Sequence, residues 1–476
     1  MQPQQDRHFD TLIIGGGIFG AGAAREAALA GWSTVLLESR DFGAATSSAS
    51  SKLLHGGLRY LASGRLRLMR EALRERELLH HLAPSLAQPT PFLAPLRQDG
   101  PFARWKLQIG LFLYDFLSGA PAGRRRDWLD RSAAIAREPA LSPDSLRGAG
   151  LYWDTRTDDA GLVLATLRGA EAAGAEVANY TTVTAITPKD EYYVIHYEHS
   201  LSGQKGTLTA RTIINAAGPW SDQIRRLLIP NAEPRALYSK GVHIVVEQRS
   251  NDNALFLSAN DDGRIFFVIP FHGRSLIGTT DSHHSGLPSD IRVDDEDIDY
   301  LIQASQRALA QPIRREEIIS SFVGLRTLAI APGSLAGLSR EETIWEEPRG
   351  VIHVVGGKLT TFRRIARRMV QMASATNKCP MDDGKLSSTT PLPESKLRAG
   401  ALEAPLAFTD SDFKYAVNEL HVQTALDFAR RRLPLTLIRR LTASERHEIA
   451  GGLGVYLGWP EEMIAKQAET MVSAHE

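Results

Sequence analysis

A fifteen-residue stretch, Thr46–Tyr60 (TSSASSKLLHGGLRY), concentrates side chains that could do chemistry. It holds hydroxyls, a lysine, a histidine, two glycines, an arginine and a tyrosine. Small residues let a backbone lie close to a ligand, and a histidine can accept a proton near neutral pH. We expect Thr46–Lys52 to lie against a cofactor and His55–Tyr60 to act on a second ligand beside it.

A nucleotide-binding pattern precedes this stretch. Phe9–Ile14 is a short apolar run that predicts a buried parallel strand. Gly15–Gly20 (GGGIFG) contains the spacing G-x-G-x-x-G, and Ala21–Ala30 is rich in strong helix formers. Ser33–Leu37 predicts a second strand, which ends at Glu38. The order of strand, glycine turn, helix, strand and acid indicates a Rossmann-type dinucleotide site.

Each residue of this pattern has a physical reason. Gly15 makes the tight turn, Gly17 lets a pyrophosphate approach the backbone, and Gly20 lets helix and strand pack closely. The helix N-terminus offers N–H groups and a positive dipole end to the phosphates. Glu38 can accept hydrogen bonds from a ribose, and its charge disfavours NADP. This unit alone leaves NAD and FAD as alternatives.

A second unit of the same design lies further along the chain. Val351–Val355 predicts a buried strand, Gly356-Gly357-Lys358 follows, and Leu359–Ala373 predicts a helix. Two helix N-termini aimed at one ligand suit a long dinucleotide. A cation such as Lys358 is unfavourable at a helix start, and a bound anion beside it would remove the conflict.

Three segments bear on how the chain is divided. Pro84–Pro101 is rich in proline and predicts a loop or a domain boundary. Gly206–Ala210 and Arg211–Trp220 predict two successive strands, the second ending in small residues. Ser387–Ser395 predicts a linker by its composition, and the chain after residue 401 is rich in helix formers.

Two segments leave a choice between an ordinary helix and a membrane surface. Leu61–Leu82 predicts a helix with five arginines on one side, and it suits either a solvated helix with i,i+4 ion pairs or a face toward anionic lipid. Trp105–Leu117 is apolar but too short to span a bilayer. It is either a core helix or an interfacial one, with Arg124–Arg126 and Trp128 beside it.

Composition narrows the partners and the compartment. Lys plus Arg equals Asp plus Glu at 55 each, so overall charge neither favours nor excludes a polyanionic partner. We expect no nucleic acid. Cys379 is the single cysteine, which fits a reducing compartment and leaves no cysteine cluster for a metal. We expect no signal peptide and no membrane-spanning helix, and therefore a cytoplasmic protein. We also expect no bound metal.

Six motifs together resemble the FAD-dependent glycerol-3-phosphate dehydrogenases, a group of D-amino-acid-oxidase-like flavoproteins. They occur in the same order and spacing over roughly residues 8–375, and the specific one is SSKLLHGGLRYL. The motifs are Gly15–Gly22, Thr46–Tyr60, Asn215–Trp220, Gly278–Asp281 (GTTD), Gly324–Arg326 and Gly356–Phe362 (GGKLTTF).

The resemblance implies roles for individual residues. His55 matches the base for the substrate C2 hydroxyl, Arg326 an arginine that orients the glycerol oxygens, and Lys358 a lysine near flavin and substrate. The implied substrate-binding residues are Arg59 and Arg340 at the phosphate, Tyr60, His243 and Thr279. Without the resemblance, His243 inside an apolar strand suits a core residue better. The cofactor-binding residues are Gly15, Gly17, Gly20, Glu38, Thr46, Ser47, Ser48, Lys52, Ala217, Gly218, Gly357, Leu359 and Thr360.

The implied activity is FAD-dependent oxidation of sn-glycerol 3-phosphate to dihydroxyacetone phosphate, in glycerol metabolism. A hydride would pass from C2 to flavin N5, and the electrons to a membrane quinone. The alternatives are an oxidase that uses O2, a flavin dehydrogenase of another hydroxy acid or amine, and a flavin-binding scaffold without turnover. We expect peripheral attachment to the inner face of the cytoplasmic membrane, and a homodimer stays open.

The expected fold is α/β (α+β overall), with three domains because 476 residues exceed one core. A Rossmann-type FAD-binding domain spans 8–90, 150–225 and 320–378. A substrate-binding or cap domain with a mixed or antiparallel sheet spans 91–149 and 226–319, and a helical domain spans 396–476. The sequence departs from the family at Gly161 and Thr327, where the family has arginine and proline, and only Val422–Leu433 resembles its C-terminal cap.

Overall fold

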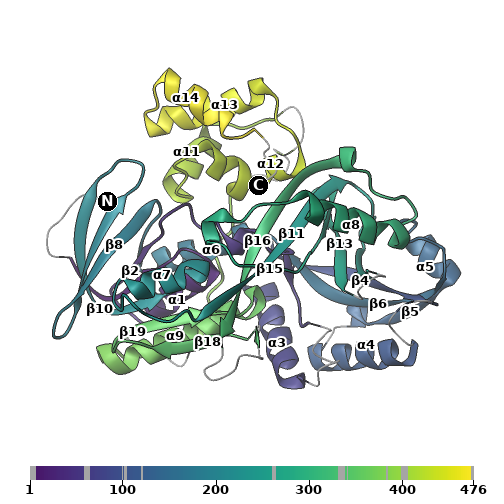
Figure 1. The fold of residues 1–476 in the computed structure, drawn as a ribbon, viewed down its shortest axis with the longest axis horizontal. Helices are drawn as coiled ribbons and strands as arrows, with labels where there is room; N and C mark the ends of the chain where they lie inside the picture. Colours follow the sequence, from purple (N-terminus) through teal and green to yellow (C-terminus); the bar gives the residue numbers. More distant parts are fainter. Residues whose placement is uncertain are drawn as a thin grey trace.

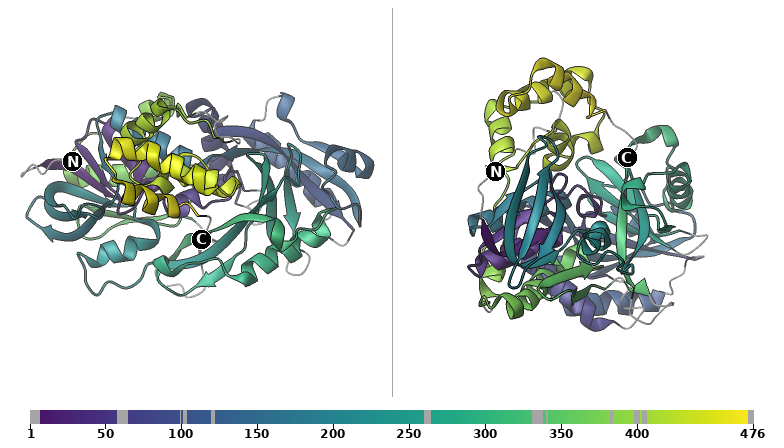
Figure 2. Two further views of the ribbon diagram at one scale, coloured as in Figure 1. Left: turned by 90° about the horizontal axis from the view of Figure 1, so that it is seen from above. Right: turned by 60° about the vertical axis from the view of Figure 1, so that its left-hand side comes forward.

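Two sheets lie side by side in the molecule, with a group of helices above them (Figure 1). The computed structural model describes residues 7–57, 65–98, 100, 104–119, 122–259, 264–330, 338–339, 341–381, 384–397, 402 and 406–472. Seen from above, the C-terminal helices lie over the first sheet rather than over the far end of the second (Figure 2).

The first sheet is the parallel sheet that the N-terminal pattern predicts. Its strands run in the order β18 (Thr343–Glu346), β19 (Val351–Val355), β10 (Lys205–Asn215), β1 (His8–Ile14), β2 (Thr34–Leu37) and β7 (Glu176–Ala178). β19, β10, β1, β2 and β7 are parallel, whereas β18 and the hairpin of β8 (Thr181–Pro188) and β9 (Tyr193–His199) are antiparallel.

Three helices cover one face of this sheet. α1 (Ile18–Leu29) lies between α6 (Asp159–Ala172) and α9 (Phe362–Asn377). The helices approach closely because α1 carries small residues on both sides: a Cβ on Gly22 would lie 2.9 Å from Ala366 Cβ. α6 begins where the Asp158 side chain accepts a hydrogen bond from Gly161 N at 2.9 Å.

The second sheet is mixed and mostly antiparallel. Its main path is β17 (Leu338–Ser339), β16 (Ile318–Ile330), β11 (Ala236–Glu247), β14 (Arg274–Gly278), β13 (Ile265–Phe271), β12 (Ala254–Ser258), β4 (Ala87–Arg97), β6 (Leu146–Thr157) and β3 (Leu53–Leu54). β15 (Ser282–His284) and β5 (Asp127–Asp130) pair beside it. The division of the chain into domains stays a prediction. β6 and β16 lie largely within the segments predicted for the FAD-binding domain, and both belong to this second sheet.

Helices pack against the second sheet in several places. α3 (Leu66–Leu82) and α4 (Arg104–Ser118) lie together at the lower edge of the molecule (Figure 1). α8 (Asp295–Ala308) packs on β11 and β12, and its start is fixed by a capping box between Asp294 and Asp297. α5 (Arg131–Arg137) packs against β5 and β6.

The C-terminal helices enclose a core of their own. They are α11 (Asp410–Glu419), a π-helix (Asp427–Arg432), α12 (Leu435–Ile438), α13 (Ala443–Leu457) and α14 (Glu461–Glu469). Phe413, Phe428 and Ile449 are buried among them. The predicted helical C-terminal segment is present in the structure.

The structure corrects the prediction of a loop over Pro84–Pro101. Residues 87–97 form β4, which pairs with β6 along its length and with β12 only at Phe92 and Leu93. Pro89, Pro91 and Pro95 are two or four residues apart, so their nitrogen atoms share one edge of the strand. The missing N–H groups therefore leave the ladder to β6 intact.

Two smaller expectations also change. Gly206–Ala210 and Arg211–Trp220 are not separate strands, because β10 runs without a break from Lys205 to Asn215. The predicted linker starts inside α10 (Lys385–Thr389) and is held against α1, where buried Arg25 donates to Ser387 O at 3.1 Å and to Thr390 O at 2.6 Å.

Candidate active site

A cavity of about 730 Å³ lies between the two sheets. Four of the residues that line it come directly after strands of the parallel sheet or within two residues of their ends: Gly15 after β1, Glu38 after β2, Ala217 after β10 and Gly357 after β19. The carboxyl ends of parallel strands meet at one edge, which explains why residues far apart in sequence converge here.

The glycine turn has the shape that a nucleotide site requires. Gly15 has φ +109°, and a Cβ on it would lie 2.6 Å from Ala216 O. Gly20 does not line the cavity; a Cβ there would lie 1.8 Å from Gly15 O, so it serves close packing. Gly17 lines the cavity at the N-cap of α1, without a side-chain cap, and leaves the helix N-terminus facing the space. A pyrophosphate fits this arrangement.

Glu38 is held in the wall by two backbone groups. Its Oε2 accepts a hydrogen bond from Gly16 N at 2.6 Å, and its Oε1 accepts one from Arg40 N at 2.8 Å. Arg40 lies over the Trp220 ring, 4.4 Å from its centroid, and both residues line the cavity. The sequence reasoning missed Arg40 and Trp220, although Arg40 follows Glu38 by two positions.

The segment 46–52 divides between the cavity and the core. Thr46 and Ser47 line the cavity: Thr46 Oγ1 donates to Leu325 O at 2.7 Å, and Ser47 Oγ accepts from Ile18 N at 3.0 Å. Lys52 is buried, and its Nζ bonds Asp159 Oδ1 at 2.5 Å and Ser48 O at 3.2 Å. Ser48 and Lys52 therefore brace the segment from behind rather than line the cavity.

His55 faces the same cavity and is fixed through its backbone. Its N–H donates to Thr360 Oγ1 at 3.1 Å, and Thr360 Oγ1 donates to His55 O at 3.4 Å. Thr360 is buried and does not line the cavity, so it holds His55 instead. Arg59, Tyr60 and Arg340 lie outside the described residues.

Arg326 brings a guanidinium group to the cavity from β16. Its Nη2 donates to Thr279 Oγ1 at 2.9 Å, and its Nη1 donates to Thr280 O at 3.2 Å and to Ser239 Oγ at 3.3 Å. Asp281 Oδ1 lies 3.4 Å from Nη1. These contacts fix the cation before any ligand arrives, and Thr279 lines the cavity beside it.

His243 lies behind the cavity wall. It is buried, stacks on Phe322 with 5.0 Å between ring centroids, and its Nε2 is 2.9 Å from Ser51 Oγ. Burial, Arg326 and Lys52 lower the pKa of His243 to about 3, so the ring is neutral at physiological pH. It reaches the cavity through Ser51, a lining residue that the sequence reasoning did not single out.

The second glycine unit lies beside the first, since a Cβ on Gly357 would lie 2.8 Å from the Phe19 ring. Gly356 and Gly357 have φ of +80° and +87°, a region that favours glycine. Lys358 and Leu359 line the cavity at the start of the helical turn Leu359–Thr361, which continues into α9. Ala217 and Gly218 line it between the two units. The structure thus gathers His55, Arg326 and Lys358 beside the nucleotide cradle.

A parallel sheet whose glycine turn and two helix N-termini open on one cavity is typical of a dinucleotide-binding protein. The family described as FAD dependent oxidoreductase (DAO) matches residues 10–372. The chain belongs to this family, and its cofactor is FAD. The predicted fold class, cofactor and enzyme class are confirmed.

Individual relatives and solved structures show which members of the family this chain resembles. The chain is 34% identical over 374 residues to the aerobic glycerol-3-phosphate dehydrogenase of Staphylococcus haemolyticus (strain JCSC1435), covering 77% of this chain and 67% of the relative. It is 35% identical over 372 residues to that of Staphylococcus aureus (strain MRSA252), with the same coverage. The glycerol-3-phosphate dehydrogenase from Bacillus halodurans complexed with FAD has a TM-score of 0.76, 24% identity and coverage of 98% and 96%. The L-alpha-glycerophosphate oxidase from Mycoplasma pneumoniae with FAD bound has a TM-score of 0.63, 17% identity and coverage of 82% and 100%.

Proposed function

We propose that the protein oxidises sn-glycerol 3-phosphate to dihydroxyacetone phosphate. The observation that carries the proposal is that His55, Arg326 and Lys358 line the same cavity as the FAD cradle. The names of the relatives support the substrate. A proton acceptor and two cations beside a flavin suit the oxidation of an alcohol that carries a phosphate.

The residues divide the work by their chemistry. FAD, when bound, supplies the acceptor for the hydride. His55 takes the proton of the C2 hydroxyl. Arg326 stabilises the negative charge that develops on that oxygen, and Lys358 adds a second cation. Arg59, Arg340 and Tyr60 are proposed at the phosphate from the family resemblance, because arginine forks suit phosphate oxygens.

Anaerobic titration of the purified yellow protein tests this proposal. Addition of sn-glycerol 3-phosphate should bleach the flavin absorbance within one turnover, whereas unphosphorylated glycerol should leave it unchanged at the same concentration. Dihydroxyacetone phosphate should appear in an amount equal to the flavin. Bleaching by an unphosphorylated hydroxy acid or an amine instead would replace the substrate, and no bleaching by any of these would favour a scaffold without turnover.

A membrane quinone is the proposed electron acceptor, because the relatives are dehydrogenases by name. Turnover with a soluble quinone analogue under nitrogen should match turnover in its presence under air. Hydrogen peroxide formed in an amount equal to the substrate consumed would instead make the protein an oxidase, the class named for one structural neighbour.

The outer face of α4 supports the proposed attachment to a membrane surface. Trp105, Ile109, Phe112 and Phe116 follow helical spacing and are 61%, 51%, 50% and 74% exposed. Arg126 lies over the Phe112 ring, 5.2 Å from its centroid, and Lys106 lies over the Trp105 ring, 5.6 Å from its centroid. Aromatic side chains beside basic ones suit the interface of an anionic bilayer. No helix in the described ranges has the length and apolarity to cross a membrane.

The basic helix α3 offers fewer free arginines to a membrane surface than its sequence suggests. Arg76 points inward to Asp154 Oδ1 at 3.1 Å, and Arg67 pairs with Glu71 four residues later at 3.2 Å. These contacts favour the interpretation of α3 as a helix with its own ion pairs. α4 is therefore the proposed contact.

Replacing two aromatic residues on α4 tests the attachment. The double variant Phe112→Ser/Phe116→Ser should bind anionic vesicles at least about tenfold more weakly, because apolar burial in the interface scales with the area removed. Sedimentation with vesicles of phosphatidylglycerol and phosphatidylcholine measures this. Leu201→Ser, a variant of a 52% exposed residue on the β9–β10 turn, is the matched control and should bind normally. Equal binding by both variants would remove α4 from the contact.

A further inference from the structure

The C-terminal helices hold a loop that forms part of the cofactor cavity. Within the described part of the chain, every residue that lines the cavity precedes Thr360. The C-terminal helices therefore touch the cavity only indirectly, through residues that they contact. These residues belong to the loop after β2, in which Glu38 and Arg40 line the cavity and Asp41 is buried behind them.

Asp41 is paired with two arginines of the π-helix Asp427–Arg432. Its Oδ2 accepts hydrogen bonds from Arg431 Nε and Arg432 Nη1, and its Oδ1 accepts one from Arg432 Nη2 at 2.7 Å. The side chains of Asp41 and Arg432 are 1% and 0% exposed. Burial opposes ionisation, but Arg432 and Arg431 outweigh it and lower the pKa of Asp41 to about 2.

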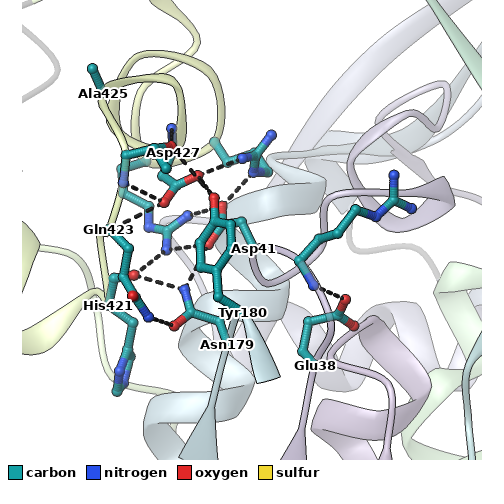
Figure 3. A network of polar contacts seen from close by, with 12 residues as sticks. Glu38, Asp41, Asn179, Tyr180, His421, Gln423, Ala425 and Asp427 are labelled. Carbon is teal, nitrogen blue, oxygen red and sulfur yellow. Dashed lines mark hydrogen bonds and ion pairs between the residues drawn. The ribbon is translucent and has the colours of Figure 1, made fainter. Parts of the chain in front are cut away.

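A second carboxylate, Asp427, completes the cluster (Figure 3). Its Oδ1 accepts hydrogen bonds from Arg431 Nη2 at 2.8 Å and from Tyr180 Oη at 2.7 Å. Tyr180 lies in the turn before β8, and its backbone N–H donates to Arg40 O at 2.9 Å. Two carboxylates and two guanidinium groups balance in charge, so loss of one member leaves a buried charge without its partner.

The same loop is tied to the glycine turn on its cavity side. Glu38 Oε2 accepts from Gly16 N, and Gly43 N donates to Gly16 O at 3.0 Å. Phe42 packs edge-on against the His421 ring, with 5.4 Å between centroids, and lies where a Cβ on Gly16 would come within 2.6 Å. A continuous set of contacts therefore runs from the C-terminal helices through residues 38–43 to the pyrophosphate turn.

We infer that docking of the C-terminal helices and binding of FAD are coupled, with Asp41 and Tyr180 as the positioning residues. A loop already ordered by the C-terminal helices loses less conformational freedom when FAD binds. The coupling is reciprocal, so bound FAD also stabilises the docked helices. The inference depends on FAD alone and holds whichever substrate the enzyme oxidises.

Release of FAD from the holoenzyme tests the coupling. Asp41→Asn should weaken FAD binding about tenfold, within the usual range of coupling between sites. Tyr180→Phe removes one hydrogen bond to the cluster without stranding a charge and should weaken FAD binding about threefold. Flavin fluorescence on serial dilution gives the dissociation constants. Arg439→Met is the matched control, because Arg439 pairs with Glu445 within the C-terminal helices, and it should retain FAD as the unaltered protein does.

A readout besides affinity separates coupling from general stability. Bound FAD should slow amide hydrogen exchange at residues 421–433 of the unaltered protein, and this protection should shrink in Tyr180→Phe but persist in Arg439→Met. If Asp41→Asn does not fold, Tyr180→Phe and the exchange of the unaltered protein decide. Unchanged FAD affinity in the folded variants, or an amide hydrogen-exchange rate at residues 421–433 that is the same with and without FAD, would overturn the inference.

Discussion

His55→Ala should slow flavin reduction by glycerol 3-phosphate at least about 100-fold, the usual contribution of a positioned general base. The proposed cause is direct: the C2 hydroxyl loses the group that accepts its proton. FAD should stay bound, because the cradle of Gly15, Gly17 and Glu38 is untouched and His55 is held by Thr360 from outside it. Anaerobic stopped-flow absorbance measures the rate, and the flavin-to-protein ratio checks the cofactor.

The pH dependence separates His55 from the other histidine near the site. The rate should fall at acid pH, because a protonated imidazole accepts no proton. His243 has its pKa lowered to about 3 by burial, Arg326 and Lys52. An acid limb due to His243 would therefore lie near pH 3, whereas one that lies closer to neutrality and vanishes in His55→Ala belongs to His55. A normal reduction rate in His55→Ala would remove it as the base.

Local patterns predicted the nucleotide half of the site well. The expected strand Phe9–Ile14 is β1 (His8–Ile14), and the expected strand Ser33–Leu37 is β2 (Thr34–Leu37). Such strands are recognisable because they are buried on both faces and read as apolar runs. Their order in a parallel sheet then brings the residues after each strand to one edge, which is why Glu38 and Gly357 line the same cavity.

Side-chain direction was harder to predict than position in the chain. The sequence predicts Lys52 at the cofactor together with its neighbours, but its backbone has φ +53° and its side chain turns into the core toward Asp159. The local sequence TSSASSK does not predict this side-chain direction, because the partner Asp159 lies 107 residues later in the chain. Tertiary contacts, which the local sequence does not encode, therefore decide where the Lys52 side chain points.

Buried polar clusters between distant segments were not predictable at all. Asp41 and Arg431 are 390 residues apart in sequence and in direct contact in space. In the sequence, Val422–Leu433 is a basic segment that resembles the C-terminal cap of the family, and the burial of the Arg432 side chain cannot be read from it. A charge run indicates a solvated face unless an opposite charge meets it, and only the folded chain shows that partner.

Arg326→Met should lower the rate of flavin reduction about 100- to 1,000-fold, comparable to the loss of one donor that stabilises a developing oxyanion. Thr279, Thr280 and Ser239 hold the guanidinium in place, so little reorganisation is needed when charge develops. The side chain of Asp281 is 37% exposed, so losing its partner at 3.4 Å should cost little stability. FAD content should remain that of the unaltered protein.

Two further variants show whether charge alone or geometry matters at this position. Arg326→Lys should recover part of the rate, because it keeps the charge but lacks the planar fork that meets Thr279 and Thr280 together. Arg264→Met is the matched control: Arg264 donates to Asp281 O at 2.9 Å from outside the cavity lining, so its loss should leave the reduction rate within about twofold, as for most surface substitutions. Equal losses in Arg326→Met and Arg264→Met would trace the effect to Asp281, and an unchanged rate in Arg326→Met would exclude Arg326 from the stabilisation of charge on the substrate oxygen.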